Sequence, residues 1–334
     1  MFFLRGCSRR LIAGALFGSV SVAGAADLTA ESQIVEDLYD AHFLDRSRGW
    51  TVGVFGAVYH TTDGGKSWNL QQTPTIQHLY GVAFTDEKTG LAVGRSGEIV
   101  RTADGGATWN RVPSGTEKHL FQVKFASPEI GWIVGDWGVV LHTRDGGNSW
   151  QDRSLTEDQI IYSVDFADET HGWMVGEFGS IRYTVDGGET WALQNAGTQK
   201  TFFGVEAVSS AKAWAVGIDG LVVRTQDAGQ TWQIQHGQAE MATFENIGFM
   251  ELLRNPGFYD VQIEGNAGYI VGDTGNVLVS LDGGETWATE QLPAEWRLSW
   301  IRGLSVLPTG WGMVVGAQGL TFEVEGKQMR FSQS

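Results

Sequence analysis

The stretch Thr102-Ala103-Asp104-Gly105-Gly106-Ala107-Thr108-Trp109 recurs along the chain and decides its fold. Five further segments share its core, an Asp with Gly two residues later and Trp five residues later. We call the six segments the Asp boxes, and they start at Asp63, Asp104, Asp145, Asp186, Asp227 and Asp282. From Asp63 to Asp227 each step is 41 residues, and the last step is 55. Such a period indicates stacked supersecondary units, in either a solenoid or a propeller.

The chemistry of the Asp box is typical of a tight turn between two strands. Its glycines supply the positive φ that such turns need, and its Asp side chain can accept hydrogen bonds from nearby backbone N–H groups. The flanking Thr or Ser hydroxyls can close the loop, and the Trp ring can pack on the neighbouring unit. We therefore interpret the boxes as structural and not as catalytic.

Each unit carries two further motifs upstream of its box. One ends in Gly-x-x-Gly, as in Gly131-Trp132-Ile133-Val134-Gly135-Asp136-Trp137-Gly138, and seven copies occur. The other is a short strand with period-two alternation, such as 161–166. Each unit then holds four antiparallel strands, the content of a propeller blade. We predict an all-β, seven-bladed β-propeller of four-stranded antiparallel blades over 38–332, whose seventh blade replaces the box with a turn at 325–327.

The first residues have the order of a secretory signal. Arg5, Arg9 and Arg10 precede an apolar run at 11–22, and small residues follow at 23–26. We predict a cleaved signal peptide over 1–26, too short to span a membrane comfortably, and an N-terminal extension over 27–37. The only cysteine, Cys7, lies in the predicted signal, so the mature chain would form no disulfide.

The charge of the chain argues against two classes of partner. The formal net charge is −16, and loss of the predicted signal would remove basic residues only. Such an acidic chain is a poor general binder of nucleic acid or of anionic membrane surfaces.

The Gly-x-x-Gly turns vary most between units, and they supply the candidate partner-binding residues. Exposed aromatic residues beside charges are typical of protein interfaces. The insertion at 239–256 is expected on the same face, either as a short helix over that face or as a loop packed on its own blades. The candidates are Phe55, Arg95, Trp137 and Phe178 in the turns, and Phe244, Phe249 and Leu252 in the insertion.

No set of residues predicts a catalytic centre, a metal site or a cofactor. None of the seven histidines has a two-His metal spacing. Polar residues in the middle of the first strands should meet at a central channel, where Lys124 could pair with Asp165. Asp165 and Glu206 are the one candidate carboxylate pair for glycoside hydrolysis.

The repeated pattern Gly-Trp-x-Val-Gly-x-x-Gly, followed by Thr-x-Asp-Gly-Gly-x-Thr-Trp, resembles the photosystem II stability/assembly factor family of propellers. The resemblance covers about 38–332. It implies a lumenal or periplasmic seven-bladed propeller that serves as an assembly scaffold for membrane protein subunits. It also implies a basic patch on one face, for which Arg101, Arg182 and Arg224 on third strands are the candidates. Sialidases share Asp boxes, but the Arg-Ile-Pro phrase that they carry is absent here.

The functional hypothesis from sequence is an exported, non-enzymatic propeller that binds another protein as a monomer. The expected partner is the extracytoplasmic part of a membrane protein complex. The expected location is the periplasm, or the thylakoid lumen in a photosynthetic host. The alternative is a glycan-binding or glycoside-hydrolysing Asp-box propeller, which would need two facing carboxylates in a cleft on the Gly-x-x-Gly face.

Overall fold

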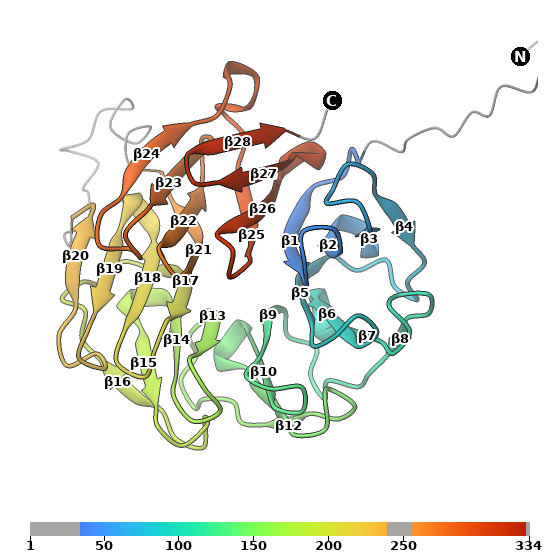
Figure 1. Ribbon diagram of the computed structural model, residues 1–334. Helices are drawn as coiled ribbons and strands as arrows, with labels where there is room; N and C mark the ends of the chain where they lie inside the picture. Colours follow the sequence, from blue (N-terminus) through green and yellow to red (C-terminus); the bar gives the residue numbers. More distant parts are fainter. Residues whose placement is uncertain (1–33, 239–255, 332–334) are drawn as a thin grey trace, which may run out of the picture. The chain divides into compact units, whose positions relative to one another are not determined.

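The computed structural model describes residues 34–238 and 256–331, which form seven four-stranded antiparallel sheets arranged as a ring (Figure 1). Blade 1 comprises β1 to β4 and blade 7 comprises β25 to β28, with each sheet built from four consecutive strands. The predicted fold class is therefore confirmed. The predicted signal peptide, the extension before residue 34 and almost all of the insertion, with Phe244, Phe249 and Leu252, lie outside the described residues.

The innermost strands surround the central axis and are followed in each blade by strands progressively farther out (Figure 1). The innermost strands are β1 (Leu38–Phe43), β5 (Leu79–Phe84), β9 (Leu120–Phe125), β13 (Ile161–Phe166), β17 (Phe202–Ala207), β21 (Phe258–Glu264) and β25 (Ile301–Val306). The second strands are β2 (Gly49–Gly53), β6 (Gly90–Gly94), β10 (Gly131–Gly135), β14 (Gly172–Gly176), β18 (Ala213–Gly217), β22 (Ala267–Gly272) and β26 (Trp311–Gly316).

The outer two strands of each blade are shorter. The third strands are β3 (Val58–Thr61), β7 (Ile99–Thr102), β11 (Val140–Thr143), β15 (Ile181–Thr184), β19 (Val222–Thr225), β23 (Asn276–Ser280) and β27 (Thr321–Glu325). The fourth strands are β4 (Asn69–Gln71), β8 (Asn110–Arg111), β12 (Gln151–Asp152), β16 (Ala192–Gln194), β20 (Gln233–His236), β24 (Ala288–Gln291) and β28 (Gln328–Phe331). Blade 7 joins β27 to β28 without an Asp box, as the sequence predicts.

The hydrophobic core lies between neighbouring blades. Second strands such as β10 are buried along their whole length, because both faces of each sheet are covered by the adjacent blades. Trp50 on blade 1 stacks on Phe84 of blade 2 with ring centroids 3.6 Å apart. Trp132 and Phe166 repeat this contact between blades 3 and 4. The aromatic residues of the repeat therefore pack one blade on the next.

The Asp boxes satisfy their own polar groups. In the second box the Thr102 hydroxyl accepts the Gly106 N–H at 2.8 Å and donates to Asp104 Oδ1 at 2.8 Å. Asp104 in turn accepts the backbone N–H and the hydroxyl of Thr108. All six boxes share this pattern. The boxes are closed structural turns.

Hydrogen bonds join the first and last blades. The Phe43 N–H donates to Ser305 Oγ at 2.8 Å, and the Gln318 N–H donates to Asp37 Oδ1 at 2.9 Å. Arg46 of blade 1 forms an ion pair with Glu325 of blade 7. Closure of the ring leaves no exposed terminal edge on the innermost layer, and Asp37 before β1 takes part in it.

Candidate functional site

The Gly-x-x-Gly turns and the Asp boxes lie at opposite ends of the blades. Leu38, at the start of β1, pairs with Gly53, which opens the first Gly-x-x-Gly turn. Gly90, at the other end of its blade, pairs with Thr102, which opens an Asp box. We call the Gly-x-x-Gly turns the tip turns and their end of the ring the tip face.

The tip turns hold bulky side chains in a strained backbone conformation. Phe55, Trp137 and Phe178 have φ of 56°, 58° and 55°, and they are 71%, 57% and 66% exposed. A left-handed conformation costs a residue other than Gly about 1–2 kcal/mol. The middle residues of the other four tip turns share it, so the turn requires this φ but does not require an aromatic side chain.

The tip turns with candidate residues follow one another around the ring. Phe55, Arg95, Trp137 and Phe178 belong to η1 (Val54–Gly56), η2 (Arg95–Gly97), η3 (Asp136–Gly138) and η4 (Glu177–Gly179), on blades 1 to 4. Blades 5 and 7 carry the matching η5 (Ile218–Gly220) and η7 (Ala317–Gly319), whereas η6 (Ala294–Trp296) follows β24. His78 lies between the first of these turns and the axis. The centroid of its ring is 5.3 Å from that of Phe55, and the ring stacks on Tyr80.

A ring of aromatic side chains surrounds the axis on the tip face, and sequence reasoning missed it. Neighbouring rings lie with centroids 5.0–5.8 Å apart. The Arg302 guanidinium closes the ring, 4.7 Å from the Tyr259 centroid and 5.9 Å from that of Tyr39. The members of the ring are Tyr39, Tyr80, Phe121, Tyr162, Phe203, Tyr259 and Arg302, one from each innermost strand.

These side chains form the wall of a cavity of about 510 Å³, which we call the axial cup. Asp40, Gln122, Ser163 and Asp260 also line it, one residue farther along their strands, and we call them the floor of the cup. The floor residues also connect blades: Asp40 accepts the Val82 N–H at 2.9 Å, and Gln122 accepts the Val164 N–H at 2.7 Å. The signal for the cup in the sequence is the aromatic residue at the second position of six first strands.

Burial raises the pKa of both floor carboxylates. The pKa of Asp40 rises to about 7, although hydrogen bonds from the Val82 and Ala41 N–H groups act against the rise. The pKa of Asp260 rises well above its usual value, because of burial first and the Asp40 charge second. Burial therefore disfavours the charged forms of both carboxyl groups, and the charge of Lys124 offsets this only in part.

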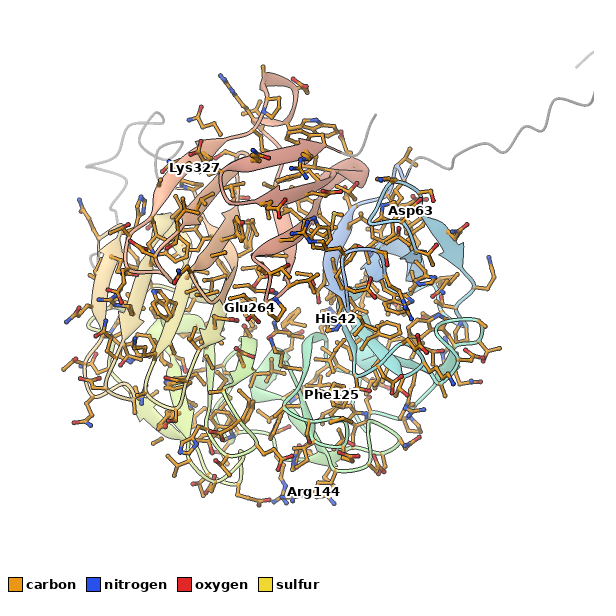
Figure 2. All side chains as sticks on the ribbon, in the orientation of Figure 1. His42, Asp63, Phe125, Arg144, Glu264 and Lys327 are labelled. Carbon is orange, nitrogen blue, oxygen red and sulfur yellow. The ribbon has the colours of Figure 1, made fainter. Side chains whose placement is uncertain are left out.

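A second polar layer lies deeper in the channel. The Lys124 ammonium pairs with Asp165 Oδ1 at 2.9 Å, which confirms the predicted pair. Burial alone would lower the pKa of Lys124, but the charges of Asp165 and Glu206 raise it overall. Burial lowers the pKa of His42 to about 4 and raises that of Glu206. Figure 2 shows His42 and Glu264 near the axis, with Arg144 at the outer edge of the ring.

The candidate glycosidase pair, Asp165 and Glu206, is engaged in holding blades together. Asp165 accepts the Ala207 N–H at 2.7 Å, and Glu206 accepts the Ile263 N–H at 3.3 Å. Both carboxylates lie in the layer beneath the floor of the cup. Their contacts describe structural links between neighbouring blades.

The three candidate arginines of a basic patch are bound to neighbouring blades. Arg101 Nε donates to the Gly146 carbonyl at 3.1 Å, and Arg182 pairs with Glu157 at 3.3 Å. Arg224 pairs with Glu285 at 2.5 Å. These side chains are links between blades and do not form a free basic patch.

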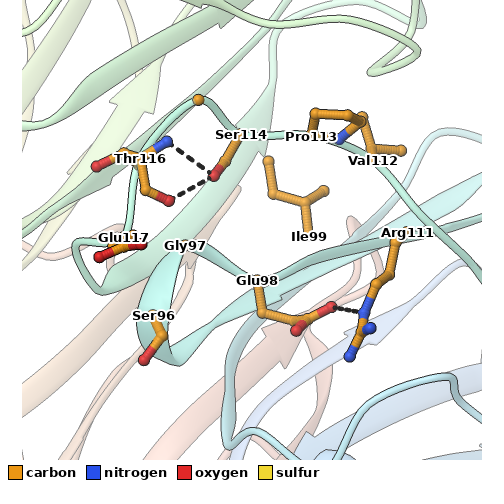
Figure 3. A pocket seen from close by; sticks show the side chains of 11 residues that line it. Ser96, Gly97, Glu98, Ile99, Arg111, Val112, Pro113, Ser114, Thr116 and Glu117 are labelled. Atoms are coloured by element: carbon orange, nitrogen blue, oxygen red, sulfur yellow. Dashed lines mark hydrogen bonds and ion pairs between the residues drawn. The ribbon is translucent and has the colours of Figure 1, made fainter.

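A second cavity, of about 540 Å³, lies on blade 2 (Figure 3). Its lining includes Glu98 and Arg111, which pair at 2.8 Å, and Ser114, which bonds Thr116. Glu98, Arg111 and Ser114 are thus already engaged with other residues of the lining. Within 34–238 and 256–331, no three His, Cys, Asp or Glu side chains cluster as a metal site, and no helix has the length and apolar character of a membrane span.

Fold and site define the class of the protein: a seven-bladed propeller with Asp boxes on one face and an aromatic tip face on the other. A family model described as Photosynthesis system II assembly factor YCF48 matches residues 67–159 and 148–243. The chain belongs to this family, and the resemblance seen in its blade motifs is confirmed.

Solved structures share the fold. A YCF48 bound to a D1 peptide has 19% identity and a TM-score of 0.68, covering 87% of this chain and 92% of that one. YCF48 from Cyanidioschyzon merolae has 18% identity and a TM-score of 0.67, covering 87% and 96%. A GH74 xyloglucanase from Xanthomonas campestris has 13% identity and a TM-score of 0.68, covering 89% of this chain and 53% of that one. No curated protein matches the sequence.

Proposed function

We propose that this protein is a non-enzymatic assembly factor that binds the extracytoplasmic part of a membrane protein complex. It acts as a monomer after export, in the periplasm or in the thylakoid lumen of a photosynthetic host. The observation that carries the proposal is the set of exposed aromatic side chains held at strained positions of the tip turns.

The tip turns suit a binding surface for physical reasons. A rigid turn presents Trp137 and Phe178 in fixed positions, so little conformational entropy is lost when a partner covers them. Exposed Arg95 lies on the blade between Phe55 and Trp137, and aromatic residues with arginine are the usual anchors of protein interfaces. Phe244, Phe249 and Leu252 are proposed to extend this surface.

Family membership supports a protein partner. A solved YCF48 holds a D1 peptide, so at least one propeller of this fold binds a polypeptide segment. The net charge of −16 favours a partner with basic segments.

Capture of membrane proteins by the purified mature protein tests the proposal. Trp137→Ala with Phe178→Ala should weaken capture strongly. Each anchor buried in an interface contributes about 2 kcal/mol or more, so the loss of one raises the Kd roughly thirty-fold. The matched control is Val185→Ala with Leu193→Ala, which removes similarly exposed apolar side chains outside the tip turns. Equal capture by the two double variants, with both folded, would place the interface elsewhere.

The axial cup gives the glycan alternative one specific observation in its favour. Its aromatic wall could stack on sugar rings, and Asp40 and Asp260 provide two carboxylates on the tip face. Both carboxylates, however, accept backbone N–H groups, and Asp40 connects two blades in this way. Incubation with xyloglucan and β-glucans should release no reducing sugar; sugar release that Asp40→Asn and Asp260→Asn each abolish would establish hydrolysis.

A further inference from the structure

We propose that the axial cup binds the cationic side chain of a lysine or arginine that the partner protein inserts from the tip face. The inference rests on the proposed function and adds the chemistry of the partner. The side chain would pass the aromatic wall and place its charge at the floor, between Asp40 and Asp260.

The first support is the charge along the axis. The innermost strands carry five acidic residues, Asp40, Asp165, Glu206, Asp260 and Glu264, against two basic ones, Lys124 and Arg302. Lys124 is occupied by Asp165 in the deeper layer. Among the described residues, neither Asp40 nor Asp260 has a cation within ion-pair distance. The floor of the cup is thus a pair of carboxylates without a partner charge.

The second support is the acceptor capacity that remains on the floor. An ionised carboxylate has about four lone-pair positions for hydrogen bonds. Asp40 accepts two N–H groups, from Ala41 and Val82. Asp260 accepts one from Val261 at 2.8 Å, and the backbone of Leu304 gives a further hydrogen bond. Each carboxylate therefore keeps positions for an ammonium or guanidinium group in the cup.

The third support is the wall of the cup. Lysine and arginine have long apolar stems that pack on hydrophobic surface, and their charged ends are attracted to the faces of aromatic rings. The wall already holds one such cation, because the Arg302 guanidinium lies 4.7 Å from the Tyr259 ring. Arg302 is exposed and stays at the mouth, 5.8 Å from the ring of Trp300.

An anionic group is disfavoured at the same place. Arg302 could pair with it at the mouth, but Asp40 and Asp260 lie beneath, and Asp273 lies beside the wall, where it accepts the Tyr259 hydroxyl at 2.8 Å. An anion deep in the cup would meet like charges at short range.

The binding of a cation should depend on pH. The groups that face Asp40 are Asp260 from blade 6, Arg302 from blade 7, Tyr80 from blade 2, Lys124 from the deeper layer, and Tyr39 and His42 from its own strand. A carboxyl with a pKa of about 7 is roughly one-tenth ionised at pH 6 and nine-tenths at pH 8. The Kd for a cation should therefore fall severalfold, and by up to about tenfold, across this range.

The direct test uses three blocked pentapeptides with glycines around a central lysine, norleucine or glutamate. Binding to the mature protein is followed by ligand-observed NMR at about pH 8 and about pH 6. We expect millimolar binding of the lysine peptide, tighter at the higher pH, and no binding of the other two. Equal signals for lysine and norleucine, or preference for glutamate, would overturn the inference.

Variants locate the site and separate the two proposals. Asp40→Asn with Asp260→Asn should abolish lysine-peptide binding. The control Asp86→Asn with Glu169→Gln, an equal charge change in exposed loops at the other end of blades 2 and 4, should not. If the double variant does not fold, Asp260→Asn alone and the wild-type peptide series decide the result.

The same variants enter the membrane capture assay. Capture that Trp137→Ala with Phe178→Ala removes, but that the floor variants leave intact, refutes the inference and keeps the proposed function. Absence of capture by the wild-type protein refutes the proposed function, whatever the peptides show.

Discussion

Thr102→Val is the sharpest probe of what the Asp box does. Thr102 is 1% exposed, and its hydroxyl accepts the buried Gly106 N–H at 2.8 Å and the Asp104 N–H at 3.2 Å. Valine has nearly the same shape but no acceptor, so the Gly106 N–H loses its partner without room for water. A buried donor left unpaired costs about 1–3 kcal/mol. We therefore expect Tm to fall by roughly 2–6 °C in a chain of this size.

Thermal unfolding followed by circular dichroism measures the effect, and Thr102→Ser is the matched control. Serine keeps the hydroxyl and should cost less than about 1 kcal/mol, the value of one methyl group. Capture of membrane proteins should be the same for both variants once they are folded. An unchanged Tm for Thr102→Val together with lost capture would refute the structural reading of the box.

Two further predictions concern the axis. Between about pH 6.5 and about pH 8.5 the Tm should fall. Burial raises the pKa of Asp40 to about 7, so the folded protein must lose a proton from this buried carboxyl as the pH rises through that value, and its stability decreases. A Tm that rises over this range contradicts the raised pKa of Asp40. Lys124→Met should lower the free energy of unfolding by about 1–3 kcal/mol, less than for a fully buried pair because Lys124 is 37% exposed. Urea titration should find a smaller loss of stability at about pH 5 than at neutral pH, because Glu206 and Asp260 bind protons more readily at the lower pH. An equal loss at the two pH values contradicts an electrostatic origin of the effect of Lys124.

The fold could be predicted because each blade repeats the same local chemistry. The turn residues located the Asp boxes, and the alternation of apolar residues located the strands. The turn propensity and the hydrophobic pattern therefore agreed in every unit. The seventh blade was recognisable without a box because Glu325-Gly326-Lys327 supplies its own turn between β27 and β28.

The axial cup could not be predicted from alternation, because a bulge interrupts it. In blade 1 the pairing skips from Leu38 with Gly53 to Asp40 with Val52. The innermost pairings of the other six blades are all shifted at the matching position. The extra residue breaks the period of two, so Tyr39 and Asp40 both line the cup. A strict period of two would have placed them on opposite faces.

The positions of the tip residues were predictable, but their strain was not. Gly-x-x-Gly indicated a turn with positive φ at its second Gly, such as Gly138 with φ 69°, but the non-glycine residue before that Gly has a positive φ as well, as at Trp137 with φ 58°. Sequence gives no sign that a tryptophan adopts this conformation, because its own preference is against it. The structure adds this observation to the case for binding at the tip face.

Site-specific photocrosslinking tests the central claim most directly. A photoreactive phenylalanine analogue at position 178 reports on the tip face, and the same analogue at exposed position 66, in the first Asp box, reports on the opposite face. After incubation with membranes, our account predicts a discrete crosslinked protein from position 178 and none from position 66. Crosslinks from position 66 alone would contradict binding through the tip face.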